Sequence, residues 1–181
     1  MGTNPMRIKK NLPLASIFVI AIALDQALKH WSMHHFRLNQ SEPFLGMKSV
    51  LLTRIANSGL IWQRYSTLFP GQVEPYIRYI PTAVILSFIT GFLYFEWNRS
   101  SRLVKAGFTL FIAGGSSNLF DHWTSYFVMD TLRLNLLNHW SQPVNLADIW
   151  IAAGIAMMFS SWVAEVFSDS LAAYWKRVDQ F

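Results

Sequence analysis

The sequence predicts an all-α integral membrane protein of four transmembrane helices, with a small extracytoplasmic β-sheet and loop. Of its 181 residues, 52% are apolar and only 14% are charged, whereas a soluble domain carries about 25% charged residues. Four charge-free runs reach membrane-crossing length once their polar flanks are included. The cationic residues gather on one side of the resulting four-span arrangement. We therefore expect a single membrane-embedded domain over residues 1–181.

The spans are expected at about 12–31, 79–97, 106–121 and 148–164. A soluble bundle is the alternative, but its helices would show a polar outward stripe, and the segment ILSFITGFLYF is apolar all round. The first span resembles a cleavable signal peptide in its basic start and apolar run. No small-x-small cleavage site follows it, and Asp25, Gln26 and Lys29 continue the helical pattern. We expect this span to be retained.

The cationic residues predict the orientation of the spans. They lie before the first span, between the second and third, and after the fourth: Arg7, Lys9, Lys10, Arg99, Arg102, Lys105, Lys176 and Arg177. Because cations are enriched on the cytoplasmic side, both termini are expected to be cytoplasmic, with outer loops at about 32–78 and 122–147. The net charge of +5 is then a topology signal, and no nucleic-acid partner is needed to explain it.

The two outer segments carry different patterns. In the first, residues 47–62 contain the β-prone stretch SVLLTRI and predict a short sheet or hairpin, whereas residues 66–76, with two prolines and a glycine, predict an irregular loop. In the second, VMDTLRL is strand-like and has an acid in its middle.

Four aspartates lie at or near the outer ends of the predicted spans, where an ionised carboxylate is costly and usually has a partner or a chemical role. Asp25 and Lys29 are four residues apart, so an intrahelical ion pair explains both. Asp121 can be the polar end of the third span, and Asp148 can cap the fourth helix. Asp130 has no such local explanation.

Two carboxylates in a partly dry site resist ionising together and hold one proton between them. The ionised member can then take a proton from water while the other donates to the scissile carbonyl oxygen. The chain has no Cys, which excludes a thiolate nucleophile and Cys-ligated metals. Asp130 with Asp148 is a plausible pair of this kind, although spacing alone leaves the pairing open.

Two other chemistries fit the residues less well. Ser116 and Ser117 beside His122 and His139 suggest a serine hydrolase, but the G-x-S-x-G pattern is absent. His30 and His34 have the spacing of two zinc ligands on a helix but lack the glutamate of H-E-x-x-H, and are better interpreted as an interfacial girdle. No metal and no cofactor are predicted.

Five motifs occur in one order: LDQALK, RIANSG, AGGSSNLFDH, VMD and VNLAD. Together they resemble the lipoprotein signal peptidase (signal peptidase II) family, whose pattern is D-Q-x-x-K, N-x-G, G-x-x-G-N-x-x-D-R, V-x-D-F and F-N-x-A-D. The resemblance covers about residues 14–164. It implies a four-helix membrane aspartic endopeptidase with a small outer β cradle, which removes signal peptides from diacylglyceryl-modified prolipoproteins by cleavage before the lipidated Cys.

The resemblance also implies roles for individual residues. Asp130 and Asp148 would be the catalytic pair. Eight residues would bind substrate or support the pair: Asp25, Lys29, Asn57, Gly59, Asn118, Asp121, His122 and Asn145. The implied partners are a lipid-modified prolipoprotein and membrane lipid. The implied state is a monomer in a bacterial cytoplasmic membrane, with its active site near the outer face.

Four residues depart from the family pattern near the expected site. His122 replaces Arg, Thr131 and Val144 each replace Phe, and Ser117 replaces Gly. The chain is therefore either a divergent active peptidase, or a non-catalytic or selective paralogue that binds lipidated peptides or an inhibitor. We expect activity, because both aspartates and both asparagines of the motifs are present.

A transporter or channel is a further alternative. Such a protein would carry polar residues at the midpoints of several spans, whereas the polar residues of this chain gather at the outer ends of the spans.

Overall fold

The computed structural model describes residues 5–58 and 74–178. The helices in this part of the chain are α1 (Pro5–His35), α3 (Glu74–Gly91), α4 (Arg102–Ser125) and α5 (Leu146–Val178). A π-helical turn, η2 (Phe92–Glu96), continues α3. The strands are β1 (Ser41–Pro43), β2 (Val50–Asn57), β3 (Val128–Leu136) and β4 (His139–Trp140), with a short 3-10 turn, η1 (Phe44–Gly46), between β1 and β2.

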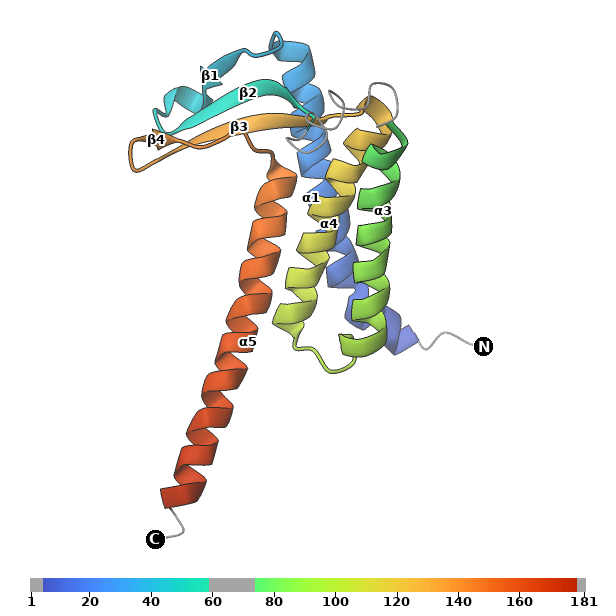
Figure 1. Cartoon of the computed structure of the whole chain (residues 1–181), viewed down its shortest axis with the longest axis vertical. Coiled ribbons are helices and arrows are strands. Elements are labelled where there is room, and N and C mark those ends of the chain that lie inside the picture. The colour runs from blue at the N-terminus through green and yellow to red at the C-terminus, as the bar shows by residue number, and fades with distance from the viewer. Residues whose placement is uncertain (1–4, 59–73, 179–181) are drawn as a thin grey trace.

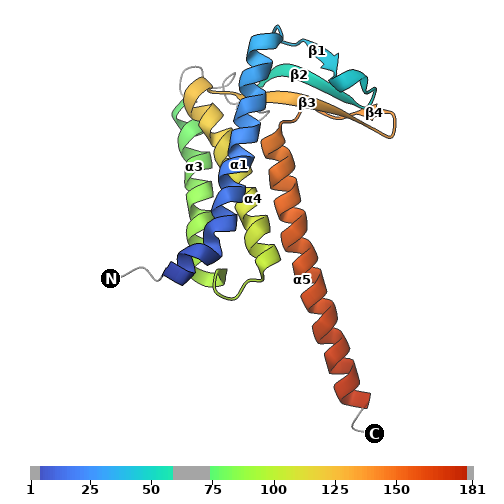
Figure 2. The ribbon, with the colours of Figure 1, turned by 180° about the vertical axis from the view of Figure 1, so that it is seen from behind.

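The helices stand side by side and the sheet lies across one end of them (Figure 1). α5 begins beneath the sheet, α4 ends near the start of β3, and α1 runs up beside the sheet to the level of β1. α1 begins and α5 ends away from the sheet, and α5 extends well beyond the other helices. Seen from behind, α1 crosses in front of α4 (Figure 2). The sheet end therefore gathers residues from α1, α4, β2, β3 and α5.

Two of the described helices are long and apolar enough to cross a membrane. These segments are Pro13–His35 in α1 and Leu146–Ser168 in α5, with mean hydropathies of 1.3 and 1.6. Tyr79–Phe95 is a shorter apolar helix. Large apolar side chains along the helices face outward, including Val19, Phe88 and Phe159. Such a surface suits lipid and would be costly in water.

The helices extend further than the spans expected from charge-free runs. The predicted outer loops begin at residues 32 and 122, but α1 continues to His35 and α4 to Ser125. The predicted irregular loop over 66–76 is wrong at residues 74–76, because α3 begins at Glu74; residues 66–73 lie outside the described part. Proline favours a loop in the sequence, yet it is also well tolerated in the first turn of a helix.

The sheet is antiparallel in the order β1-β2-β3-β4. The short sheet or hairpin expected within 47–62 is present, in its described residues, as the single strand β2, whose partners β1 and β3 come from outside that range. The strand-like VMDTLRL stretch is β3. Their register places Ile55 opposite Asp130, with an irregularity between Leu52 and Ile55. Leu132 also pairs with Val144, just before α5. This pairing brings the start of α5 to the middle of β3, near Asp130.

α4 and α5 pack closely through two glycines. A Cβ placed on Gly107 would lie 2.8 Å from the carbonyl oxygen of Gly154. A Cβ on Gly154 would clash with the carbonyl oxygen of Gly107 and lie 2.7 Å from the Phe111 nitrogen. Small residues let membrane helices approach to this distance.

Gly154→Ala is therefore expected to destabilise the protein by about 1–3 kcal/mol, because the new methyl group meets backbone that cannot move aside. The measurement is the thermal unfolding temperature in detergent. Gly91→Ala is the control, since a Cβ there meets nothing within 4 Å, and it should leave the unfolding temperature unchanged or raise it. Equal effects of the two substitutions would contradict the close contact.

Candidate active site

Asp130 lies on β3 with its carboxylate held by two amides. Its Oδ2 accepts a hydrogen bond from Asn57 Nδ2 at 2.9 Å, and its Oδ1 accepts one from Asn145 Nδ2 at 3.1 Å. The residue is 2% exposed. Its backbone carbonyl accepts from the buried Thr53 hydroxyl at 3.0 Å. The side chain is therefore fixed by β2 on one side and by the approach to α5 on the other.

Asp148 lies in the first turn of α5 and forms a reciprocal cap with Asn145. The Asp148 backbone nitrogen donates to Asn145 Oδ1 at 2.9 Å, and the Asn145 backbone nitrogen donates to Asp148 Oδ2 at 3.2 Å. This pattern satisfies two otherwise free N–H groups at the helix start. Because Asn145 also donates to Asp130, one fully buried residue contacts both carboxylates. Asp148 therefore caps α5, as its place before an apolar run predicts, and it shares Asn145 with Asp130.

The other oxygen of Asp148 is linked to α1 through α4. Asn118 Nδ2 donates to Asp148 Oδ1 at 2.9 Å, and Lys29 Nζ donates to Asn118 Oδ1 at 3.0 Å. The lysine fixes which end of the Asn118 amide is the acceptor, so the amide must present its NH₂ group to Asp148.

Lys29 is buried between two carboxylates. Its Nζ lies 2.7 Å from Asp25 Oδ2 and 2.7 Å from Asp121 Oδ2, and Lys29 is 1% exposed. The expected Asp25–Lys29 pair within α1 is confirmed, but Asp121 adds a second partner from α4. A buried charge needs such compensation.

Each carboxylate of this cluster also anchors the backbone next to one of the two central aspartates. Asp25 Oδ1 accepts from the nitrogen of Ala147, the residue before Asp148, at 2.9 Å. Asp121 Oδ2 accepts from the nitrogen of Met129, the residue before Asp130, at 3.3 Å. The Asp25–Lys29–Asp121 cluster therefore ties β3 and α5 to the same lysine.

The environment of Asp130 favours its protonated form. Burial raises the pKa of Asp130 to about 6, and the charge of Asp148 adds to the rise. The hydrogen bonds from Asn57 and Asn145 and the charge of Lys29 act in the opposite direction. A carboxylic acid with such a pKa can hold a proton near neutral pH and give it to a reacting group.

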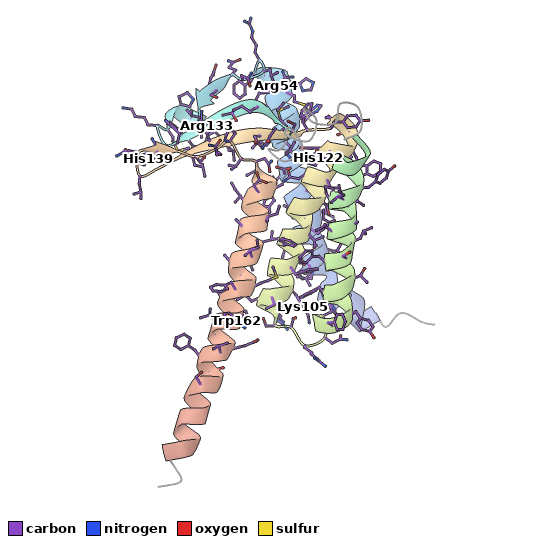
Figure 3. All side chains as sticks on the ribbon, viewed as in Figure 1. Arg54, Lys105, His122, Arg133, His139 and Trp162 are labelled. Atoms are coloured by element: carbon purple, nitrogen blue, oxygen red, sulfur yellow. The ribbon has the colours of Figure 1, made fainter. Side chains whose placement is uncertain are left out.

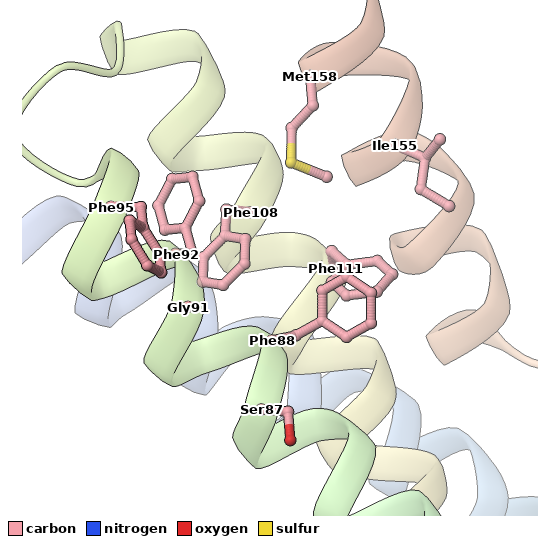
Figure 4. A pocket seen from close by; sticks show the side chains of 9 residues that line it. All are labelled: Ser87, Phe88, Gly91, Phe92, Phe95, Phe108, Phe111, Ile155 and Met158. Carbon is pink, nitrogen blue, oxygen red and sulfur yellow. The ribbon is translucent and has the colours of Figure 1, made fainter.

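A hollow in the protein is apolar and does not include these acids in its lining. It has a volume of about 700 Å³ and lies between α3 with η2, α4 and α5. Figure 4 shows aromatic side chains from α3, η2 and α4 facing Ile155 and Met158 of α5. Phe92 and Phe108 stack there with ring centroids 3.8 Å apart. Its lining contains no titratable group, so this hollow can hold apolar chains but supplies no acid–base chemistry.

The chain matches the model of a known protein family. A family model described as "Signal peptidase (SPase) II" matches residues 17–164. The chain belongs to the signal peptidase II family. It is an aspartic peptidase family, which fits a site built around two neighbouring carboxylates, Asp130 buried and Asp148 partly buried.

Curated relatives and solved structures agree with this family. A lipoprotein signal peptidase of Bartonella henselae is 29% identical over 149 residues, covering 81% of this chain and 86% of the relative. One from Lactococcus lactis subsp. cremoris (strain SK11) is 30% identical over 153 residues, covering 83% and 93%. A bacterial membrane enzyme solved by the in meso method superposes with a TM-score of 0.70 at 16% identity, over 83% of this chain and 92% of that one; this last match shows the fold.

The residues expected around the signal peptidase II site are largely brought together. Asp25, Lys29, Asn57, Asn118, Asp121 and Asn145 all join the network described above. Gly59 lies outside the described residues. His122 lies at the sheet end of α4 (Figure 3). It makes no hydrogen bond to Asp130 or Asp148 within the described part of the chain, and its buried Nδ1 has no partner there.

Three further residues belong to the network. Gln26 Nε2 donates to Asp121 Oδ1 at 2.9 Å and to Ser117 Oγ at 2.9 Å, and Ser117 Oγ donates to Asp25 Oδ2 at 2.7 Å. Thr53 supports Asp130 from β2. In the sequence, Gln26 stands out as a polar residue inside an apolar span, whereas Ser117 stands out only as a departure from the family pattern. Ser117 is fully buried and its hydroxyl donates to Asp25, so the structure gives it a supporting contact within the Asp25–Lys29–Asp121 cluster.

Proposed function

We propose that this signal peptidase II uses Asp130 and Asp148 as its catalytic pair to cleave diacylglyceryl-modified prolipoproteins before the lipidated Cys. The observation that carries the proposal is the bridging by Asn145, which binds both carboxylates from one buried position. The raised pKa of Asp130 supports it, because the pair then holds one proton and one negative charge.

The reaction needs no covalent intermediate. The ionised carboxylate takes a proton from water as the water oxygen attacks the scissile carbonyl carbon. The protonated carboxyl donates to the carbonyl oxygen, giving a neutral tetrahedral intermediate. The carboxyl that took the proton from water then donates it to the leaving nitrogen, while the other carboxylate takes a proton from one hydroxyl of the intermediate. The C–N bond breaks, which leaves a carboxylic acid on the signal peptide and an amine on the lipidated Cys, and the pair returns to its starting protonation state.

Activity is expected to fall as pH rises above about 6, the pKa of Asp130. Below that pH Asp130 holds its proton and can donate it; above that pH the proton is lost and both carboxylates are charged. The measurement is kcat/KM against pH in detergent, with a limiting decline of about tenfold per pH unit. Circular dichroism over the same range controls for unfolding. A profile that stays flat, or rises, through this range would contradict the assignment of the proton to Asp130.

We further propose that the Asp25–Lys29–Asp121 cluster, with Asn57, Asn118 and Asn145, positions the pair. The two carboxylates of the cluster hold the backbone immediately before each catalytic aspartate. The Lys29–Asn118 link orients a donor toward Asp148. A site supported in this way keeps the two carboxylates at a fixed separation during the reaction. Gly59 and His122 are proposed, on the family pattern alone, to lie near the substrate.

The whole chain, residues 1–181, is proposed to act as one membrane domain with four spans and cytoplasmic termini, as a monomer in the cytoplasmic membrane. The site then lies near the outer face, where the substrate's acyl chains can stay in the bilayer. The apolar hollow suits the apolar part of a signal peptide, since Ile155 lies about 10 Å along α5 from Asp148.

The test compares a diacylglyceryl-modified prolipoprotein with the same precursor lacking the lipid. Purified protein should convert the lipidated precursor to a smaller product on a gel and leave the unmodified precursor largely intact. Equal cleavage of both precursors would contradict the lipid requirement.

A second function, binding of lipidated peptide without turnover, is favoured by one observation. Two of the four departures from the family pattern, His122 and Thr131, carry buried polar atoms with no hydrogen-bond partner in the described residues. Such atoms weaken a preorganised site. Saturable binding of the lipidated precursor with no product would support this function over the peptidase.

A further inference from the structure

The sheet ends, on the side away from Asp130, in a group of exposed apolar side chains. This apolar tip consists of Phe44, Leu45, Met47, Leu137 and Trp140. Leu45 is 85% exposed and Leu137 is 94% exposed. Single exposed apolar residues are ordinary, but here they come from two turns far apart in the sequence.

The strand pairing brings these two turns together. Val50 pairs with Leu134, and the Asn135 nitrogen donates to the Ser49 carbonyl at 2.8 Å. The connection between β1 and β2 and the turn between β3 and β4 therefore lie at the same end of the sheet, which projects sideways past the start of α5 (Figures 1 and 2).

Both leucines adopt a backbone conformation that leucine rarely adopts. Leu45 has φ 49° and Leu137 has φ 52°, in the left-handed region. The next residues, Gly46 and Asn138, are also left-handed, with φ 75° and 66°, and Gly and Asn are the types that tolerate it. A leucine at either position strains the backbone, while its side chain lies almost entirely outside the fold. The folded chain gains little from these two side chains, so their benefit must come from what surrounds the tip.

The position and composition of the tip identify these surroundings. The tip lies at the level where α5 begins, beside a helix long and apolar enough to cross a membrane. Arg133 and His139 lie along the same end of the sheet (Figure 3), and exposed Lys48 lies within the β1–β2 connection. Exposed leucines combined with Trp and nearby cations are typical of a surface that sits in the headgroup region of a bilayer.

We propose that the apolar tip inserts into the outer leaflet of the membrane that α5 crosses, with Leu45 and Leu137 among the acyl chains. β3 carries Asp130 toward one end and leads to Leu137 at the other. Insertion of the tip therefore fixes the depth of β3, and with it Asp130, at the interface. The inference rests on the membrane orientation of the proposed function but not on the catalytic pair.

The absence of Cys allows a direct test. Leu45→Cys, Leu137→Cys and Ser41→Cys are labelled with an environment-sensitive fluorophore and reconstituted in nanodiscs containing phosphatidylglycerol. Ser41 is the matched control, because it is exposed on the outer strand β1. At positions 45 and 137 we expect blue-shifted emission that is mostly lost when the lipids carry brominated acyl chains, and at position 41 neither effect. Water-like, unquenched emission at 45 and 137 would overturn the proposal. The readout needs no cleavage and can be repeated in Asp130→Asn, so it is independent of the peptidase assignment.

A second variant tests the leucines themselves. Leu45→Asn combined with Leu137→Asn should keep or raise the unfolding temperature in detergent, because Asn tolerates the left-handed backbone. A label at Met47→Cys should be quenched by the brominated lipids in the otherwise native chain and lose that quenching in the Asn variant. Unchanged quenching in the Asn variant would show that the leucines do not hold the tip in the membrane.

Discussion

Replacing Asp130 or Asp148 by Asn is expected to abolish cleavage while the protein stays folded and inserted. Each substitution keeps the volume of the side chain but removes the proton exchange that the pair performs. Loss of a general acid–base group costs about 10²- to 10⁴-fold in rate, and both roles depend on the pair holding a single proton. The measurement is kcat/KM on the lipidated precursor.

The fold should survive both changes for identifiable reasons. In Asp130→Asn the new amide oxygen can still accept one of the two hydrogen bonds that Asp130 receives from Asn57 and Asn145. In Asp148→Asn, Asn145 still caps α5 through its own side chain. Glu42→Gln, at an exposed carboxylate on β1, is the control for loss of a charge and should remain fully active. Wild-type activity in either purified Asp variant would exclude that residue from the catalytic pair.

Lys29→Met is expected to destabilise the protein by about 3–5 kcal/mol and to eliminate activity. In the native protein one carboxylate oxygen of Asp25 and one of Asp121 each lie 2.7 Å from Lys29 Nζ. The substitution leaves both carboxylates buried without this shared cation, and an uncompensated buried charge has a cost of this size. The measurement is thermal unfolding in detergent together with cleavage. Lys48→Met is the control, because Lys48 is exposed and a surface change of this kind stays within about 0.5 kcal/mol.

Asn118→Ala separates positioning from stability in the same network. It removes the link from Lys29 to Asp148 but leaves both ion pairs of Lys29 in place. We expect a much lower kcat with a smaller loss of stability than in Lys29→Met. If Lys29→Met unfolds at the wild-type temperature, or Asn118→Ala keeps full kcat, the proposed role of the cluster is wrong.

The sequence predicted the parts of this site that depend on local geometry. The Asp25–Lys29 pair follows from a four-residue spacing on one helix, and the cap at Asp148 from an acid in the first turn of an apolar run. The strand around Asp130 follows from β-prone residues. The resemblance to a family then connected Asp130 with Asp148, a pairing that spacing alone could not select.

The contacts that the sequence did not reveal are those made between elements. Lys29 meets Asp121 only because α1 packs on α4 at one particular rotation, and no local pattern encodes that rotation. Asn145 bridges two carboxylates because Leu132 pairs with Val144, a register that belongs to the folded sheet. Pro75 shows that a local signal can also be ambiguous, because proline is compatible with a loop and with the first turn of a helix.

Mass spectrometry of the reaction products tests the central claim most directly. Wild-type protein and Asp148→Asn are incubated separately with a diacylglyceryl-modified prolipoprotein. We predict that wild type releases two products, the intact signal peptide with a free carboxylate and a lipoprotein that begins at the lipidated Cys, and that Asp148→Asn releases neither. Cleavage at another position, or the same products from both proteins, would contradict the account.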